Sequence, residues 1–126
     1  MTPVISAIIL AAGESHRMGK PKQLLPLGKT TILEHTIDNF LNSEVHQVIV
    51  VVGYRAKEIV SLIANRPVSI AVNPAYGEGM STSIGAGLGL IGDMTQGVML
   101  ALGDQPFIDS QTINRLVASF DTQGKG

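Results

Sequence analysis

A short glycine-containing stretch carries most of the residues that could do chemistry in this chain. Residues 10–26 read LAAGESHRMGKPKQLLP, with Gly13 directly after an apolar run and Arg17, Lys20 and Lys22 behind it. Backbone N–H groups of such a turn can bind an anion, and Arg and Lys add donors and charge that suit phosphate oxygens. We therefore expect a polyphosphate ligand here, with an ordinary loop of solvated basic residues as the alternative.

Two common phosphate-binding motifs do not match this loop. A Walker A loop has four residues between its glycines and a hydroxyl after its lysine, whereas Gly13 and Gly19 enclose five residues and Pro21 follows Lys20. A dinucleotide fingerprint fails as well, because no glycine lies two residues after Gly13. Residues 87–92, GLGLIG, have the fingerprint spacing, but they lie in a helix-like segment and do not follow a strand, so we interpret that match as accidental.

An acidic turn is the second candidate for chemistry. Asp104 follows the apolar run 98–102 and precedes Gln105, so its carboxylate is expected to project from the end of a strand. Mg²⁺ prefers carboxylate and phosphate oxygens, and one carboxylate with waters and a nucleotide is a usual arrangement. An aspartate that only stabilises the turn is the alternative. The three histidines are scattered and lack the spacing of a metal site.

Strand-like and helix-like segments alternate along the chain. Apolar runs of strand length are followed by segments with helical spacing of apolar residues, and Asp109 is placed to cap the last helix. This alternation predicts a mainly parallel sheet with helices on both sides. The expected strands cover residues 4–10, 45–52, 68–72 and 98–102, and the expected helices cover 32–41, 56–64, 80–91 and a last segment with Ile113, Leu116, Val117 and Phe120 facing inward.

Such a sheet would bring the candidate residues together. In an open parallel sheet, ligands bind beyond the carboxyl ends of the strands. The segments that follow the expected strands are 12–22, 53–55, 73–83 and 103–106. We therefore expect the glycine-containing loop and the acidic turn to share one crevice, whereas Met80 is expected to be a packing residue.

Composition argues against several other function classes. With 126 residues and 44% hydrophobic content, the chain is expected to form one domain, residues 1–126. A net charge of −1 leaves no basic surplus for nucleic acid, and the lack of cysteine excludes disulfides and agrees with a cytoplasmic location. The apolar run 4–12 has no basic leader and is too short to span a bilayer, so no membrane partner is expected.

The glycine-containing loop resembles the nucleotide-binding signature of MobA-like nucleotidyltransferases. Residues 10–22, LAAGESHRMGKPK, fit its general form of Leu-Ala-(Ala or Gly)-Gly, then Arg-Met-Gly, then Lys. Residues 73–83, NPAYGEGMSTS, and 102–106, LGDQP, are similar to two further motifs of that family. The resemblance thus extends over nearly the whole chain, from Val4 to Phe120.

Two details place the resemblance in the molybdenum-cofactor branch of the family. Ser15 and His16 stand where related sugar-phosphate transferases have Gly-Thr. Ala12 stands where guanylyl-transferring members have Gly, and in this it resembles the cytidylyltransferases that act on molybdopterin. This implies transfer of CMP from CTP to the terminal phosphate of molybdopterin, with release of pyrophosphate. The alternatives are another nucleotidyltransferase of the same fold, using GTP or acting on a sugar or alcohol phosphate, and a nucleotide-binding module without turnover.

The resemblance also implies a fold and a set of site residues. The implied fold is a Rossmann-like three-layer α/β/α arrangement with a mainly parallel sheet, as in nucleotide-diphospho-sugar transferases. Arg17, Lys22 and Asp104 would be catalytic, and Asp104 would hold Mg²⁺, with CTP as the substrate. The expected nucleotide-binding residues are Leu10, Ala11, Ala12, Gly13, Arg17, Lys22, Asn73, Gly79 and Ser83.

The chain is short for the family that it resembles, so we expect the C-terminal part of the family fold to be lacking. An apolar edge or face of the sheet would then be exposed, which predicts self-association or poor solubility. The expected partners are a nucleoside triphosphate, a molybdopterin-type acceptor, and a molybdoenzyme or a second copy of the chain.

Overall fold

The computed structural model describes residues 3–13, 16–17 and 20–120, with the backbone alone described at residues 16, 17, 20 and 21. Its strands are β1 (Ile5–Ala11), β2 (His16–Arg17), β3 (Lys20–Pro21), β4 (Pro26–Leu27), β5 (Thr30–Thr31), β6 (Gln47–Val52), β7 (Ser69–Val72) and β8 (Gly97–Leu102). Its α-helices are α1 (Ile32–Leu41), α2 (Ala56–Ile63), α3 (Met80–Leu88) and α4 (Ser110–Ser119), and two 3₁₀ turns cover Lys22–Leu24 and Tyr76–Glu78.

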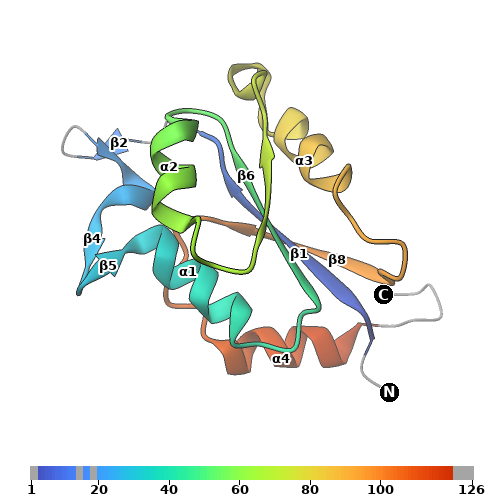
Figure 1. Cartoon of the computed structure of the whole chain (residues 1–126). Coiled ribbons are helices and arrows are strands. Elements are labelled where there is room, and N and C mark those ends of the chain that lie inside the picture. Colours follow the sequence, from blue (N-terminus) through green and yellow to red (C-terminus); the bar gives the residue numbers. More distant parts are fainter. Residues whose placement is uncertain (1–2, 14–15, 18–19, 121–126) are drawn as a thin grey trace.

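The centre of the fold is a four-stranded sheet in the order β7-β6-β1-β8 (Figure 1). All neighbours pair in parallel, and Ile8 of β1 lies opposite Ile49 of β6 and Leu100 of β8. The inner strands β1 and β6 are almost wholly buried, which explains their continuous runs of aliphatic residues. The predicted α/β class with a mainly parallel sheet is confirmed.

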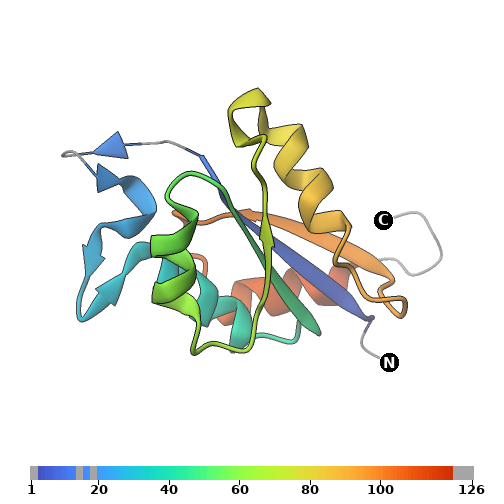
Figure 2. The ribbon, with the colours of Figure 1, turned by 45° about the horizontal axis from the view of Figure 1, so that its top comes forward.

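Helices pack against both faces of this sheet. The side chains of β1 alternate, so that Ile5, Ala7 and Ile9 face a core built with α1, α2 and α4, whereas Ile8 faces a second core beside α3. Figures 1 and 2 show α3 on one side of the sheet and α1 with α4 on the other. The three-layer arrangement follows from this alternation.

Local contacts fix the position of α1. Thr31 and Glu34 form a capping box at its first turn, which satisfies two backbone donors that the helix leaves free. Arg66, from the segment after α2, reaches Glu34 Oε2 at 2.9 Å and Asp38 Oδ1 at 2.8 Å. The hydrogen bond that Arg66 donates to Asp38, with the charges of both carboxylates, raises the pKa of Arg66. Helix α1 is therefore anchored by its own first turn and by the segment after α2.

Two details of the predicted helices are wrong. Helix α3 ends at Leu88 and not at residue 91, because Gly89 follows as its C-cap and glycine propagates a helix poorly. Leu116 of α4 is 51% exposed, although it was expected to face inward. Ile113 and Val117, one turn apart, form the buried stripe, and Leu116 lies about 100° round the helix from Val117.

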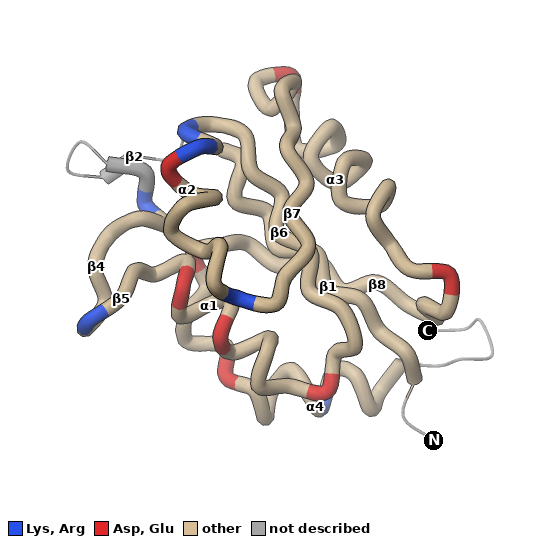
Figure 3. The backbone as a smooth tube through the Cα atoms, in the orientation of Figure 1, with Lys and Arg blue, Asp and Glu red and all other residues tan. Residues whose placement is uncertain are grey.

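Strand β8 presents an apolar face to solvent. Val98, Leu100 and Leu102, on alternate positions, are 42%, 49% and 41% exposed. Helix α3 packs over β6 and β1, and neither it nor β8 carries a charged residue (Figure 3). The exposed apolar face that the sequence led us to expect is therefore present among the described residues. Among the helices of the described residues, none is long and apolar enough to cross a bilayer.

Candidate functional site

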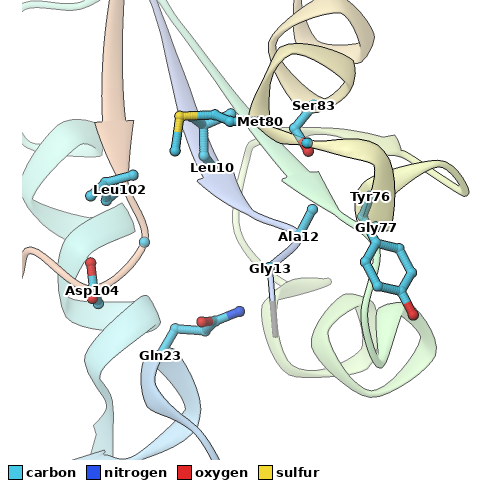
Figure 4. Close-up of a pocket in the computed structure, with 12 residues that line it drawn as sticks. Leu10, Ala12, Gly13, Gln23, Tyr76, Gly77, Met80, Ser83, Leu102 and Asp104 are labelled. Atoms are coloured by element: carbon cyan, nitrogen blue, oxygen red, sulfur yellow. The ribbon is translucent and has the colours of Figure 1, made fainter. Parts of the chain in front are cut away.

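The candidate site lies where the topology of the sheet opens a crevice. From β1 the chain continues to β6, which pairs with one edge of β1, whereas β8 pairs with the other edge. The loops that follow β1 and β8 therefore diverge. A cavity of about 420 Å³ lies at this point, within the usual size range of small-ligand sites. Its walls (Figure 4) are formed by Leu10, Ala12, Gly13, Gln23, Tyr76, Gly77, Gly79, Met80, Ser83, Leu102, Gly103 and Asp104.

One wall carries a pair of opposite charges. Lys22 Nζ lies 3.2 Å from Asp104 Oδ2, and the two side chains are 37% and 24% exposed. Ion pairs this accessible to water are worth about 0–1 kcal/mol, so a ligand can separate the partners at little cost. Both predicted residues therefore stand beside the cavity in a form that a phosphate or a cation can engage.

The turn that carries Asp104 is packed tightly against β1. The N–H of Gly103 donates to the carbonyl of Leu10 at 2.9 Å. A Cβ at position 103 would lie 3.1 Å from Leu33 Cδ1 and 3.3 Å from Ala11 Cβ, so the turn approaches its neighbours more closely than a larger residue would permit. The carboxylate of Asp104 consequently leaves the sheet from a fixed backbone.

The opposite wall is organised by Asn73. This buried side chain donates from Nδ2 to Thr82 Oγ1 and to Ser83 Oγ, each at 2.9 Å, and its Oδ1 accepts from the N–H of Ala75 at 3.0 Å. Ser83 lines the cavity, whereas Asn73 stands behind it. Among the described contacts, Ser83 accepts a hydrogen bond and keeps its hydroxyl proton to donate to a ligand.

The first turn of α3 also faces the cavity. Gly79 precedes the helix with φ 120°, a conformation that strains any residue with a side chain, and Met80 is its first residue. The first N–H groups of a helix have no partner within it and favour anions. Met80 lies at the cavity wall and is 59% exposed, so the expectation that it packs in the interior is wrong.

The floor of the cavity is the end of β1. Leu10, Ala12 and Gly13 line it, whereas the side chain of Ala11 belongs to the core on the opposite face. The carbonyl of Ala11 accepts from Gln23 Nε2 at 2.9 Å. This bond fixes Gln23 beside the floor, and Figure 4 shows its amide pointing toward Gly13.

The structure thus brings together most of the predicted site residues. Leu10, Ala12, Gly13, Gly79, Ser83 and Asp104 line the cavity, Lys22 contacts Asp104, and Ala11 and Asn73 support the walls from behind. The side chain of Arg17 lies outside the described part of the structure.

Sequence reasoning missed several residues of the same cavity. Gln23 directly follows Lys22, and Tyr76 and Gly77 belong to residues 73–83, which resemble a family motif. Their proximity to a motif is the signal that could have identified them. Leu102 and Gly103 precede Asp104 in the same way. In each case the residue lies within or next to a motif, and the fold determines which side chains of that segment face the cavity.

The donor set indicates which cations suit the site. No group of three or more His, Cys, Asp and Glu side chains gathers anywhere among the described residues, so they form no all-protein cage. Among the described residues that line the cavity, Asp104 supplies the carboxylate, and it pairs with the ammonium group of Lys22. This set fits Mg²⁺, which commonly shares one or two carboxylates with phosphate oxygens and water.

An α/β domain with a cavity at the switch point of its sheet, flanked by a lysine and a carboxylate, is a nucleotide-binding architecture. The model of the MobA-like NTP transferase domain matches residues 7–126, and the chain belongs to that family.

Known proteins similar to this chain agree with the family. The molybdenum cofactor cytidylyltransferase of Escherichia coli (strain K12) is 39% identical over 103 residues, which are 81% of this chain and 52% of that protein. The nicotine blue oxidoreductase of Paenarthrobacter nicotinovorans is 32% identical over 118 residues, 93% of this chain and 57% of that protein. The chain therefore spans little more than half the length of these relatives.

Solved structures support the same fold. The structure of a nucleotidyl transferase from Methanothermobacter thermautotroptrophicus superimposes with a TM-score of 0.86 at 30% sequence identity. The match covers 94% of this chain and 58% of that one. The predicted resemblance to MobA-like nucleotidyltransferases is confirmed.

Proposed function

We propose that this chain is the single nucleotide-binding domain, residues 1–126, of an enzyme that transfers CMP from CTP to the terminal phosphate of a molybdopterin-type acceptor. An oxygen of the acceptor phosphate attacks the α-phosphorus, the bond from that phosphorus to the β-phosphate oxygen breaks, and pyrophosphate leaves. The observation that carries this proposal is the ion pair of 3.2 Å between Lys22 and Asp104, of which Asp104 lines the cavity.

The charged pair supplies the groups that such a transfer needs. Lys22 can release Asp104 and bind oxygens of the triphosphate, and Arg17 is proposed as a second donor to the same phosphates. Asp104 would hold Mg²⁺, which supplies positive charge as pyrophosphate departs. Phosphoryl and nucleotidyl transfer depend mainly on positioning and charge, so no covalent nucleophile from the protein is required.

The rest of the cavity is suited to a nucleoside. Leu10, Ala12 and Gly13 offer a flat floor of small and apolar groups, and the Ser83 hydroxyl faces the space above it. We assign the base and the ribose to this part, with the first turn of α3 after Gly79 directed to an anionic group of the ligand. The size of the side chain at Ala12 then helps to determine which base fits.

The relatives leave room for other acceptors and another nucleotide. The name of the Escherichia coli relative supports CTP and the molybdenum cofactor, whereas GTP or a sugar or alcohol phosphate would suit the same fold. The name of the second relative states an oxidoreductase, so family membership alone does not fix the reaction. A domain that binds nucleotide without turnover is the remaining alternative, with a molybdoenzyme or a second copy of the chain as its partner.

The experiment is a pyrophosphate-release assay on the purified chain. CTP, GTP and ATP are each supplied with Mg²⁺ and with a molybdopterin-type acceptor, a sugar phosphate or an alcohol phosphate. We expect release with CTP and the molybdopterin-type acceptor, reduced about 10²–10³-fold in Lys22→Met, because positioned charge contributes on that scale. Lys29→Met removes a lysine from the exposed turn between β4 and β5 and should leave the rate unchanged.

The assay also separates the alternatives. Release with another nucleotide or acceptor would replace the substrates proposed here and keep the reaction class. Binding of CTP without release under any condition would favour the non-catalytic module.

A further inference from the structure

The carboxylate of Asp104 is aimed by a turn that two side chains of α1 hold from behind. We propose that Thr36 and Asn39 are positioning residues for Asp104, and that they set the affinity of the site for a divalent cation. This inference rests on the proposed function, because it assigns Asp104 to the cation. Neither side chain lines the cavity, so each acts through the backbone of the turn.

The two contacts lie on either side of Asp104. The hydroxyl of Thr36, wholly buried, donates to the carbonyl of Gly103 at 3.2 Å and shares its proton with the carbonyl of Ile32 at 3.0 Å. Asn39 Nδ2 donates to the carbonyl of Pro106 at 2.8 Å. Since residues 36 and 39 are neighbours on one helix face, α1 holds both ends of the segment that contains Asp104.

The strand side of the same turn is also fixed. The N–H of Gly103 donates to the carbonyl of Leu10 at 2.9 Å, and Gln105 Oε1 accepts from the N–H of Leu102 at 3.1 Å. The turn is therefore held from the sheet and from α1 at once. Among the described residues, the Asp104 carboxylate contacts Lys22, and this exposed ion pair constrains it weakly, so the direction of the carboxylate depends on its backbone.

These contacts have a role beyond holding α1 in place. Helix α1 already has its capping box and its buried Leu33, Ile37 and Phe40. A helix anchored in this way does not need Thr36 and Asn39 for its own position. Their polar atoms instead reach a turn 67 residues further along the chain, the one that carries the candidate metal ligand.

The test is the affinity for Mn²⁺, an EPR-visible substitute for Mg²⁺, titrated into the purified chain with CTP present and corrected for the same titration of CTP alone, because the cation is expected to share phosphate oxygens with Asp104. Thr36→Val and Asn39→Leu remove the donors at nearly constant volume and should weaken Mn²⁺ binding about 10-fold, the lower end of the range for groups that orient a metal ligand. Thr36→Ser restores the hydroxyl and should restore the affinity. Ser43→Ala, which removes another hydroxyl-to-carbonyl bond at the end of α1, should bind as the wild type does.

Folding is checked by circular dichroism on every variant. If folded Thr36→Val and Asn39→Leu bind Mn²⁺ as tightly as the wild type, the proposal is overturned. Equally weak binding in Thr36→Val and Thr36→Ser would also overturn it, because the hydroxyl alone would then not account for the affinity.

A second readout keeps this inference separate from the proposed function. If the wild type itself does not bind Mn²⁺, or if Asp104→Asn binds it equally well, the metal assignment of the proposed function fails. Amide hydrogen exchange at residues 103–105 then decides whether α1 positions the turn. Faster exchange in Thr36→Val and Asn39→Leu, with no change in Ser43→Ala, supports it, and unchanged exchange overturns it.

Discussion

Helix α3 contains two glycines that should respond to the same substitution with opposite sign. A Cβ at Gly87 would lie 2.7 Å from Ile8 Cγ2, 3.1 Å from Ile8 Cδ1 and 3.1 Å from Val51 Cγ2, all of them buried side chains of the sheet. A Cβ at Gly85 would have open space around it. Because both positions are helical, Gly87→Ala and Gly85→Ala differ mainly in this contact.

The magnitudes follow from two competing terms. Replacing glycine by alanine inside a helix stabilises it by about 0.5–1 kcal/mol. At Gly87 the close approach to Ile8 must be relieved by moving α3 or the sheet, and such overpacking costs about 1–3 kcal/mol. We therefore expect Gly85→Ala to raise the free energy of unfolding by about 0.5–1 kcal/mol, and Gly87→Ala to lower it by about 1–2 kcal/mol.

The assay is urea unfolding followed by circular dichroism, with the midpoints compared at a common m-value. A displaced α3 would also move Ser83 at the cavity wall, so Gly87→Ala should weaken CTP binding while Gly85→Ala preserves it. Equal midpoints for the two variants, or a stabilised Gly87→Ala, would refute the close packing of α3 on β1.

Three further expectations concern other parts of the fold. Arg66→Met leaves the nearly buried carboxylate of Glu34 without its partner and should lower the free energy of unfolding by about 2 kcal/mol in the same urea assay. The hydrogen bond from Thr112 N–H lowers the pKa of Asp109, so its stabilising effect is complete above the ordinary aspartate range and is lost as the pH falls through the lowered value. Asp109→Asn keeps the cap, so its stability deficit at pH 7 should begin to shrink in unfolding measured below about pH 4 and disappear once the pH is below the lowered pKa. We expect the exposed apolar face of β8 to promote self-association and Leu100→Glu to reduce it, as measured by sedimentation velocity across a concentration series.

The elements that position the site could be read from the sequence because each has its own local signal. Long aliphatic runs identified β1, β6 and β8, and the cap at Asp109 identified α4. The rule that ligands bind at the carboxyl ends of parallel strands then brought Lys22 and Asp104 to one crevice before any coordinates were known. The ion pair between them agrees with that step.

The parts that the sequence did not predict depend on contacts between distant segments. Thr36 and Asn39 look like ordinary helix residues, and their partners in the turn lie 67 residues away. The short pairs β2–β3 and β4–β5 have two residues in each strand, too few for a periodic signal. Local pattern cannot report such contacts, because they exist only once the sheet has formed.

Gly87 is a residue that matches a local motif although its role depends on tertiary packing. The GLGLIG spacing drew attention to residues 87–92 as an accidental fingerprint, and in the structure this glycine lies in α3 and not at the end of a strand. Its nearest neighbours are side chains of β1 and β6, so close packing accounts for it. A glycine can satisfy a motif by spacing and be required for a different physical reason.

The most direct test of the central claim is a thermal-shift comparison of the chain with CTP, GTP, ATP and NAD, each with and without Mg²⁺. A ligand at about 100 times its dissociation constant adds roughly 2.7 kcal/mol to the stability of the folded state, which is a readily measured rise in Tm. We expect Mg²⁺ with CTP to give the largest rise and Asp104→Asn to reduce it, while Lys29→Met responds as the wild type does. Equal or absent shifts with all four nucleotides, or an undiminished shift in Asp104→Asn, would contradict a Mg²⁺-dependent CTP site at the carboxyl ends of β1 and β8.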